Sequence, residues 1–153
     1  KRKISKSLGN GISQQDVTEK YGADVLRLWV SSTDYQSDVH ISNEILKQIS
    51  ESYRIIRNTA RYILGNVYDF NPDTDSVPVN ELMPMDKWAI VKLNELIAKV
   101  KQAYDNYEFH QVYHSIRNFC VIDMSNFYLD IQKKATASQE RLRRLQSISF
   151  LTL

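Results

Sequence analysis

The chain has 153 residues, of which 42% are hydrophobic and 25% are charged, a composition typical of soluble globular proteins with one or two small domains. No apolar run approaches the roughly 18–20 residues that a membrane span requires, so we expect no membrane partner. Only four glycines and three prolines interrupt the chain, too few for the many turns of a β-sandwich or barrel. We therefore expect long helices.

The charge of the chain is small but unevenly distributed. The formal net charge is +2, yet four of the 20 basic residues, namely Lys1, Arg2, Lys3 and Lys6, lie at the very start and leave 16 basic against 18 acidic residues elsewhere. A cationic tip on a near-neutral body is suited to local contact with phosphate groups. The single cysteine, Cys120, cannot form an internal disulfide. This favours a reducing compartment, and we predict a cytoplasmic protein.

The first part of the chain is predicted to hold a loop and short elements. Residues 1–12 are basic and contain serine and glycine, which predicts a loop. Ser13 is a suitable N-cap for a short helix that ends before Gly22. A second helix is predicted over 23–29, and the alternation of apolar and polar residues over 39–41 predicts a short strand.

The clearest predicted element is a long amphipathic helix that begins after Ser42 and ends near Gly65. Its apolar positions recur every three or four residues and so form one stripe along a helix: Ile45, Ile49, Tyr53, Ile56, Ala60, Ile63 and Val67. Another face of this helix carries four basic residues within a sector of roughly 80°. They are Lys47, Arg54, Arg57 and Arg61.

The second half of the chain is predicted to complete a bundle. Residues 69–84 hold all three prolines and are predicted as a connecting loop. A second long helix then begins at Asp86. After a break near 105–106 a third long helix covers 109–131, and a fourth runs from Ser138 to the chain end. Their predicted core positions are Ala89, Leu93, Leu96, Val100, Ala103 and Tyr107, then Phe109, Val112, Ile116, Phe119, Cys120, Phe127 and Ile131. The predicted fold is mainly α, an up-down helical bundle preceded by a short α/β region.

The strongest local signal for chemistry is the segment Lys3-Ile4-Ser5-Lys6-Ser7-Leu8-Gly9-Asn10. Two lysines three positions apart on a small, hydroxyl-rich loop can bring positive charge to phosphate oxygens. Such a loop can stabilise the negative charge that develops during attack on an α-phosphate. From charge alone, however, a frayed basic terminus explains the same residues.

A family resemblance bears on this choice. Lys3-Ile4-Ser5-Lys6-Ser7 resembles the Lys-Met-Ser-Lys-Ser motif of class I aminoacyl-tRNA synthetases, and Tyr21-Gly22-Ala23-Asp24-Val25-Leu26-Arg27 is similar to the isoleucine, valine and leucine branch. Further segments resemble the isoleucyl-tRNA synthetase family: residues 29–35, 38–42, 44–48, 57–59, 64–66, 69–72 and 107–110. The likeness runs in family order from residue 1 to about 134.

The resemblance implies formation of isoleucyl-adenylate from isoleucine and ATP, with Mg²⁺, and transfer to tRNA. In the family the second lysine of the motif contacts ATP, which assigns a catalytic role to Lys6 and a weaker one to Lys3, with Ser5 and Ser7 in the ATP-binding loop. Residues 1–41 would end the catalytic region with a stem-contact segment. Residues 42–153 would form a truncated helical anticodon-binding domain.

The sequence also departs from the family pattern. The nucleotide-binding fold of the class carries a His-x-Gly-His motif, whereas the histidines here are His40, His110 and His114. We expect that fold and the isoleucine pocket to precede Lys1, so that the chain alone is inactive and binds no cofactor itself. After Asp130 the family's usual continuation is missing, and we expect an omitted segment between Lys133 and Ser138, with a truly short loop as the alternative.

Other groups of residues have two interpretations. The basic residues of the long helix could bind the phosphates of a tRNA stem, or form a solvated face with ion pairs such as that of Glu51 with Arg54. His110 and His114 have the spacing of two metal ligands on a helix, but no third ligand is evident, and we predict no metal site. Some aromatic residues could stack on anticodon bases, although core packing explains them better: Trp88, Tyr104, Tyr107, Phe119 and Phe127.

Two alternative functions remain open at the level of sequence. One is a valyl- or leucyl-tRNA synthetase fragment, against which the stretch 29–35 argues. The other is a free-standing helical tRNA-binding module that does not need ATP. The sequence upstream of Lys1 distinguishes the enzyme from the module, because only the enzyme requires a nucleotide-binding fold there.

Overall fold

The N-terminal part of the structure contains the two short helices that the sequence predicts. The computed structural model describes residues 11–67 and 69–134. The predicted fourth helix, residues 1–10 of the predicted basic loop and the predicted gap beyond residue 134 therefore lie outside the described residues. Helix α1 covers Gln14–Tyr21 and α2 covers Ala23–Ser32. The Ser13 hydroxyl accepts a hydrogen bond from the Asp16 amide at 3.0 Å, as an N-cap does. Gly22, at φ 90°, separates the two helices in a conformation that favours glycine.

The predicted strand at 39–41 is wrong. No β-strand is present among residues 11–67 and 69–134, and 38–42 form an irregular connection. The Asp34 carboxylate accepts hydrogen bonds from the Gln36 amide and the Ser37 hydroxyl, both at 2.9 Å, which closes a turn instead. Val39 is 48% exposed, so its alternation with Ile41 buries no face. A strand needs a partner for its backbone groups, and no other segment in the part of the chain that the structure describes supplies one.

Helix α3 is the long helix that the sequence predicts, over Asn43–Asn66 with Ser42 as its N-cap. Its buried face differs in part from the apolar stripe. Ile49 and Ile63 are buried as predicted, whereas Ala60 is exposed. Two hydroxyl residues, Ser52 and Thr59, lie on the buried face at 4% and 5% exposure.

The segment between α3 and the next long helix is less irregular than predicted. It contains a short helix α4 at Pro72–Asp75 and a 3₁₀ turn η2 at Val79–Glu81. The following helix α5 covers Pro84–Asp105 and so begins two positions before the predicted Asp86. Both α4 and α5 have proline in their first turn, where the missing N–H costs nothing. Proline therefore starts these helices rather than preventing them.

The predicted third helix is a continuous rod with a change of winding. It consists of α6 at Phe109–Asn118, a π-helical segment η3 at Phe119–Tyr128 and α7 at Leu129–Lys134. The Leu129 amide donates to the Met124 carbonyl, five residues back, as a π-helix requires. The wider turn moves Met124 and Tyr128 into the core and leaves Phe127 42% exposed. The predicted core position of Phe127 is therefore wrong.

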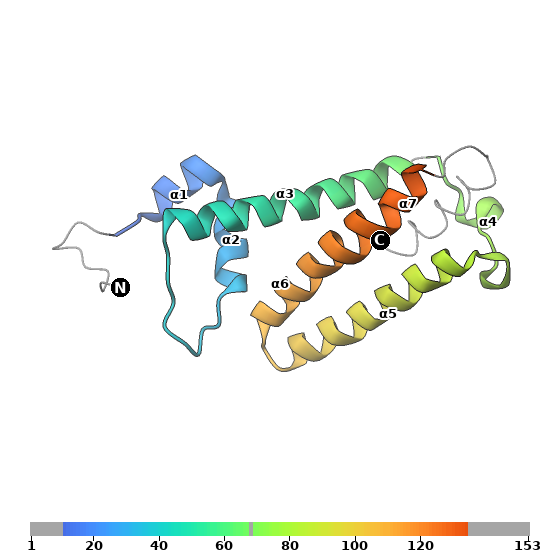
Figure 1. Ribbon diagram of the computed structural model, residues 1–153. Coiled ribbons are helices and arrows are strands. Elements are labelled where there is room, and N and C mark those ends of the chain that lie inside the picture. Colours follow the sequence, from blue (N-terminus) through green and yellow to red (C-terminus); the bar gives the residue numbers. More distant parts are fainter. Residues whose placement is uncertain (1–10, 68, 135–153) are drawn as a thin grey trace.

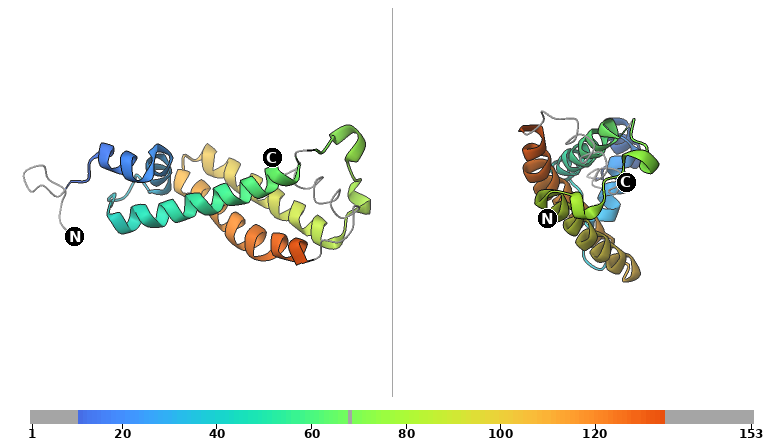
Figure 2. Two further views of the ribbon diagram at one scale, coloured as in Figure 1. Left: turned by 90° about the horizontal axis from the view of Figure 1, so that it is seen from above. Right: turned by 90° about the vertical axis from the view of Figure 1, so that its right-hand side faces the viewer.

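The long helices pack as a bundle. Helix α5 and the α6–η3–α7 rod lie side by side and antiparallel, while α3 crosses the rod obliquely (Figures 1 and 2). One core cluster joins α3, α5 and η3 around Ile63, Leu93 and Tyr128, and a second joins α2, α3 and α6 around Val25, Ile49 and Tyr113. The mainly helical fold is confirmed. None of the described helices is long and apolar enough to cross a bilayer.

Candidate nucleic-acid interface

The four basic residues predicted on α3 lie together on its exposed face. Lys47, Arg54, Arg57 and Arg61 are all exposed, and the centre of their sector lies roughly opposite the buried face at ~100° per residue. Arg54 forms an ion pair with Glu51, one turn away, with N and O 2.5 Å apart. Within residues 11–67 and 69–134, the other three have no acidic partner within 4.0 Å. We call these four residues the α3 stripe.

The ion pair in the α3 stripe is of the weak, solvated kind. The Arg54 and Glu51 side chains are 68% and 51% exposed, and such pairs contribute about 0–1 kcal/mol to stability. The remaining cations of the stripe cost the fold little because water solvates them. Lys47, Arg57 and Arg61 can therefore offer their charge to an anionic partner without giving up an ion pair to a described residue, and Arg54 would give up only its weak pair with Glu51.

A pocket of about 510 Å³ lies where α2, α3 and α6 meet, and its lining includes Glu51, the ion-pair partner of Arg54. We call it the Arg117 pocket; its polar lining residues are Ser32, Gln48, Glu51, Ser52, His114 and Arg117. The half-buried Arg117 donates from Nε to the Ser52 hydroxyl at 2.9 Å. That hydroxyl donates in turn to the Gln48 carbonyl at 3.1 Å. The chain of bonds fixes the guanidinium against α3.

The second polar group of this pocket is an imidazole. Burial lowers the pKa of His114, and the nearby charges of His110 and Arg117 lower it further. At neutral pH the His114 ring is therefore neutral and can both donate and accept a hydrogen bond. The positive charge of the pocket wall thus rests on Arg117.

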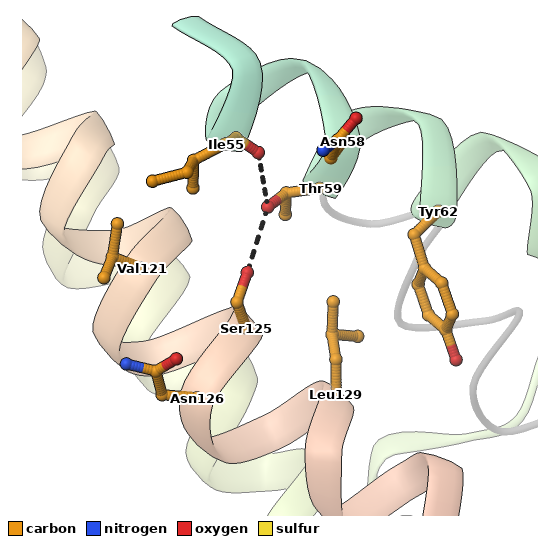
Figure 3. Close-up of a pocket in the computed structure, with 8 residues that line it drawn as sticks. All are labelled: Ile55, Asn58, Thr59, Tyr62, Val121, Ser125, Asn126 and Leu129. Carbon is orange, nitrogen blue, oxygen red and sulfur yellow. Dashed lines mark hydrogen bonds between the residues drawn. The ribbon is translucent and has the colours of Figure 1, made fainter. Parts of the chain in front are cut away.

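A smaller pocket of about 310 Å³ opens between α3 and η3 (Figure 3). The hydroxyls of Thr59 and Ser125 are 3.2 Å apart in its wall, and Thr59 also donates to the Ile55 carbonyl at 3.0 Å. Figure 3 shows the amide groups of Asn58 and Asn126 on opposite sides of this pair. The hydroxyl pair joins α3 to the π-helical segment by a polar contact inside a largely apolar contact region.

The aromatic residues considered for base stacking have different environments. Phe119 is buried at 8%, as core packing predicts. Trp88 packs edge-to-face on Phe127, with ring centroids 4.8 Å apart. Tyr104 and Tyr107 are 54% and 65% exposed, so the predicted core position of Tyr107 is wrong. It lies in the α5–α6 turn at φ 59°, and its ring makes an edge-to-face contact with the half-exposed Phe109.

The structure shows the environments of the two histidines at metal-ligand spacing and of the single cysteine. His114 is exposed at the surface although its ring is partly desolvated at the pocket, whereas His110 is half-buried. No group of three or more His, Cys, Asp or Glu side chains in the described parts of the chain is arranged to hold a metal ion. Cys120 is 8% exposed, and burial raises the pKa of its thiol. It is the small buried hydrophobe that its place in the apolar pattern predicts.

The residues predicted to bind ATP belong to the part of the chain that the structure does not describe. Lys3, Ser5, Lys6 and Ser7 lie outside the described residues, and their roles remain predictions. Conversely, the structure adds Arg117 and Ser52, which the sequence interpretation did not select. The sequence contains one indication that Arg117 is partly buried. It follows the apolar Ile116 and so lies at the edge of the apolar stripe of α6.

Two family models match this chain. The anticodon-binding domain of tRNA ligases matches residues 86–152. The class I tRNA synthetases for I, L, M and V match residues 1–42.

Curated proteins from several bacteria are similar to most of the chain. The isoleucine–tRNA ligase of Symbiobacterium thermophilum is 53% identical over 97% of this chain and 16% of its own length. That of Geobacillus thermodenitrificans is 58% identical over 99% of the chain and 17% of its own length. That of Caldicellulosiruptor saccharolyticus is 58% identical over 86% of the chain and 14% of its own length. The chain thus spans about one sixth of the length of these relatives.

Proposed function

The chain belongs to the isoleucine–tRNA ligase family, and on that premise we propose that it is part of an enzyme that activates isoleucine with ATP and joins it to its tRNA. The observation that carries this proposal is the identity of 52–58% to ligases that all bear the same amino acid in their name. The mainly helical bundle supports it, because the anticodon-binding family model matches the described helices from residue 86.

We divide the proposed work between two parts of the chain. Residues 1–41 supply the end of the catalytic region, and residues 42–153 supply the helical tRNA-binding part. The two family models support this division, since they match 1–42 and 86–152. We place the complete enzyme in the cytoplasm, where protein synthesis uses its product.

In the proposed reaction the basic loop acts on the nucleotide. The Lys6 ammonium stabilises the negative charge on the phosphates of ATP as pyrophosphate leaves, and Lys3 assists it. Ser5 and Ser7 shape the loop around the nucleotide. Bound together with ATP, Mg²⁺ would neutralise part of the triphosphate charge. The described residues contribute to tRNA binding, for which the α3 stripe supplies exposed cations.

The test is amino acid specificity in the complete protein that contains this chain. ATP–pyrophosphate exchange is measured with isoleucine, valine and leucine, followed by charging of the matching tRNA. Isoleucine should give the highest kcat/KM, with valine lower by about 10–200-fold because it lacks one methylene group. Preference for leucine or valine would identify another branch of the family. The absence of exchange with all three would support a tRNA-binding module without catalysis.

A further inference from the structure

The Arg117 pocket contains a cation that the fold does not neutralise. Arg117 is half-buried, and in the part of the chain that the structure describes no carboxylate lies within 4.0 Å of it. Its one hydrogen bond there runs from Nε to the Ser52 hydroxyl, which is a neutral acceptor. Partial burial of an unpaired charge is unfavourable. An anionic partner bound in the pocket would supply the missing counter-charge for this guanidinium.

The hydrogen bond to Ser52 determines which atoms are available. It occupies Nε and holds the plane of the guanidinium, while the two terminal nitrogens have no hydrogen-bond partner among the described residues and can donate together. A guanidinium fixed in this way matches two oxygens of one phosphate group. Ser52 is 4% exposed and itself bonded to the Gln48 carbonyl, so the orientation is built into α3.

The charges around the pocket favour an extended anion. Glu51 is the acidic residue of the lining, and it is already paired with Arg54. Lys47 lies one turn before Glu51 and Arg54 nearly one turn after it, so these two residues of the α3 stripe flank the acidic edge of the pocket. A single phosphate would use Arg117 alone. A polymer of phosphates would use Arg117 together with Lys47 and Arg54.

We propose that the Arg117 pocket binds one backbone phosphate of the tRNA, while Lys47 and Arg54 of the α3 stripe bind neighbouring phosphates along the same strand. This inference rests on the proposed function, because it takes tRNA as the partner. It adds a defined contact in which Arg117 binds the phosphate through its terminal nitrogens and Ser52 positions Arg117. Since phosphates carry no sequence information, the contact supplies affinity and register rather than anticodon specificity.

The experiment measures tRNA binding by the complete ligase across a range of salt concentrations. Arg117→Gln should raise Kd about 5–20-fold and lower the salt slope by about one. Arg117→Lys keeps the charge but loses the fork, and should raise Kd about 2–5-fold with an unchanged slope. Ser52→Ala should resemble Arg117→Lys. The matched control is Lys101→Gln, which removes one exposed charge on α5 and should leave Kd within about twofold.

Ethylation interference makes the result independent of any change in folding. Ethylation of one particular phosphate should weaken wild-type binding and should not further weaken binding by Arg117→Gln. Unchanged Kd and salt slope in Arg117→Gln, or the same interference pattern in both proteins, would overturn the proposal. Isoleucine-dependent ATP–pyrophosphate exchange needs no tRNA and tests the proposed function separately.

Discussion

Tyr128 and Asp86 are joined by a buried hydrogen bond between residues 42 positions apart: the Tyr128 hydroxyl donates to Oδ1 of Asp86 at 3.1 Å. The two side chains are 1% and 2% exposed. The same carboxylate accepts from the Met83 amide at 3.3 Å through Oδ2 and so caps the start of α5. One acidic side chain therefore fixes both the first turn of α5 and the end of the π-helical segment.

Replacing Tyr128 by Phe should destabilise the contact between α5 and η3 by about 1–3 kcal/mol, because the buried Asp86 carboxylate loses a donor. Hydrogen exchange of the α5 and η3 amides in the complete protein measures this change. The control is Tyr35→Phe, which removes a hydroxyl from a side chain that is 58% exposed and should have an effect below about 0.5 kcal/mol. Equal exchange in both variants would show that the buried bond contributes nothing to stability.

Sequence periodicity predicts helices well here because it depends on an average over many residues. The start of α3 at Asn43 follows from the Ser42 cap, and its course to Asn66 follows from the apolar spacing. Individual buried positions are harder to predict. Ser52 and Thr59 are polar, but each donates its hydroxyl hydrogen to the carbonyl four residues back and accepts or shares a bond across the helix contact. That arrangement makes their burial tolerable, and it depends on a partner helix that the local sequence does not reveal.

The change of winding at Phe119 is likewise absent from the local pattern. A regular α-helical period would place Phe127 on the core side with Phe119 and Cys120. The π-helical turn places Met124 and Tyr128 there instead, so tertiary contacts such as the bond to Asp86 decide the register. The candidate site was predictable to the same extent. The α3 stripe is visible in the sequence. Arg117 stands out only in the structure, where it donates a hydrogen bond to Ser52, 65 positions away.

Two glycines should respond in opposite directions to replacement by alanine. Gly22 has φ 90°, where a Cβ is strained although no atom lies within 4 Å, so Gly22→Ala should destabilise the α1–α2 junction by about 1 kcal/mol. Gly65 lies inside α3 with open space around it, so Gly65→Ala should stabilise the end of that helix by about 0.5 kcal/mol. Hydrogen exchange of the two segments measures both changes. Effects of the same sign would contradict this backbone explanation.

Replacing Lys6 by Ala should reduce adenylate formation in the complete enzyme. The loss is expected to be on the order of 10²–10³ in kcat, because a charge that acts mainly on the transition state is removed. Isoleucine-dependent ATP–pyrophosphate exchange measures it. A variant within a factor of about two of wild type would assign the role to another residue. Lys101→Gln again serves as the control for the loss of a single lysine charge.

The pH dependence of stability should contain a contribution from His114. Its pKa in the folded protein is lowered from 6.5 by burial and by the charges of His110 and Arg117. Between the two pKa values the unfolded chain binds more protons than the folded one, so stability falls as the pH drops through 6.5 and below. His114→Gln should reduce the loss of stability between pH 7.5 and 5.5, measured as the difference in Tm. Arg117→Gln should raise the pKa of His114 in an NMR titration, because one of the repelling charges is gone. If the His114 titration is the same with and without Arg117, the guanidinium does not act on the imidazole across the pocket, and the pH effect comes from burial and His110 alone.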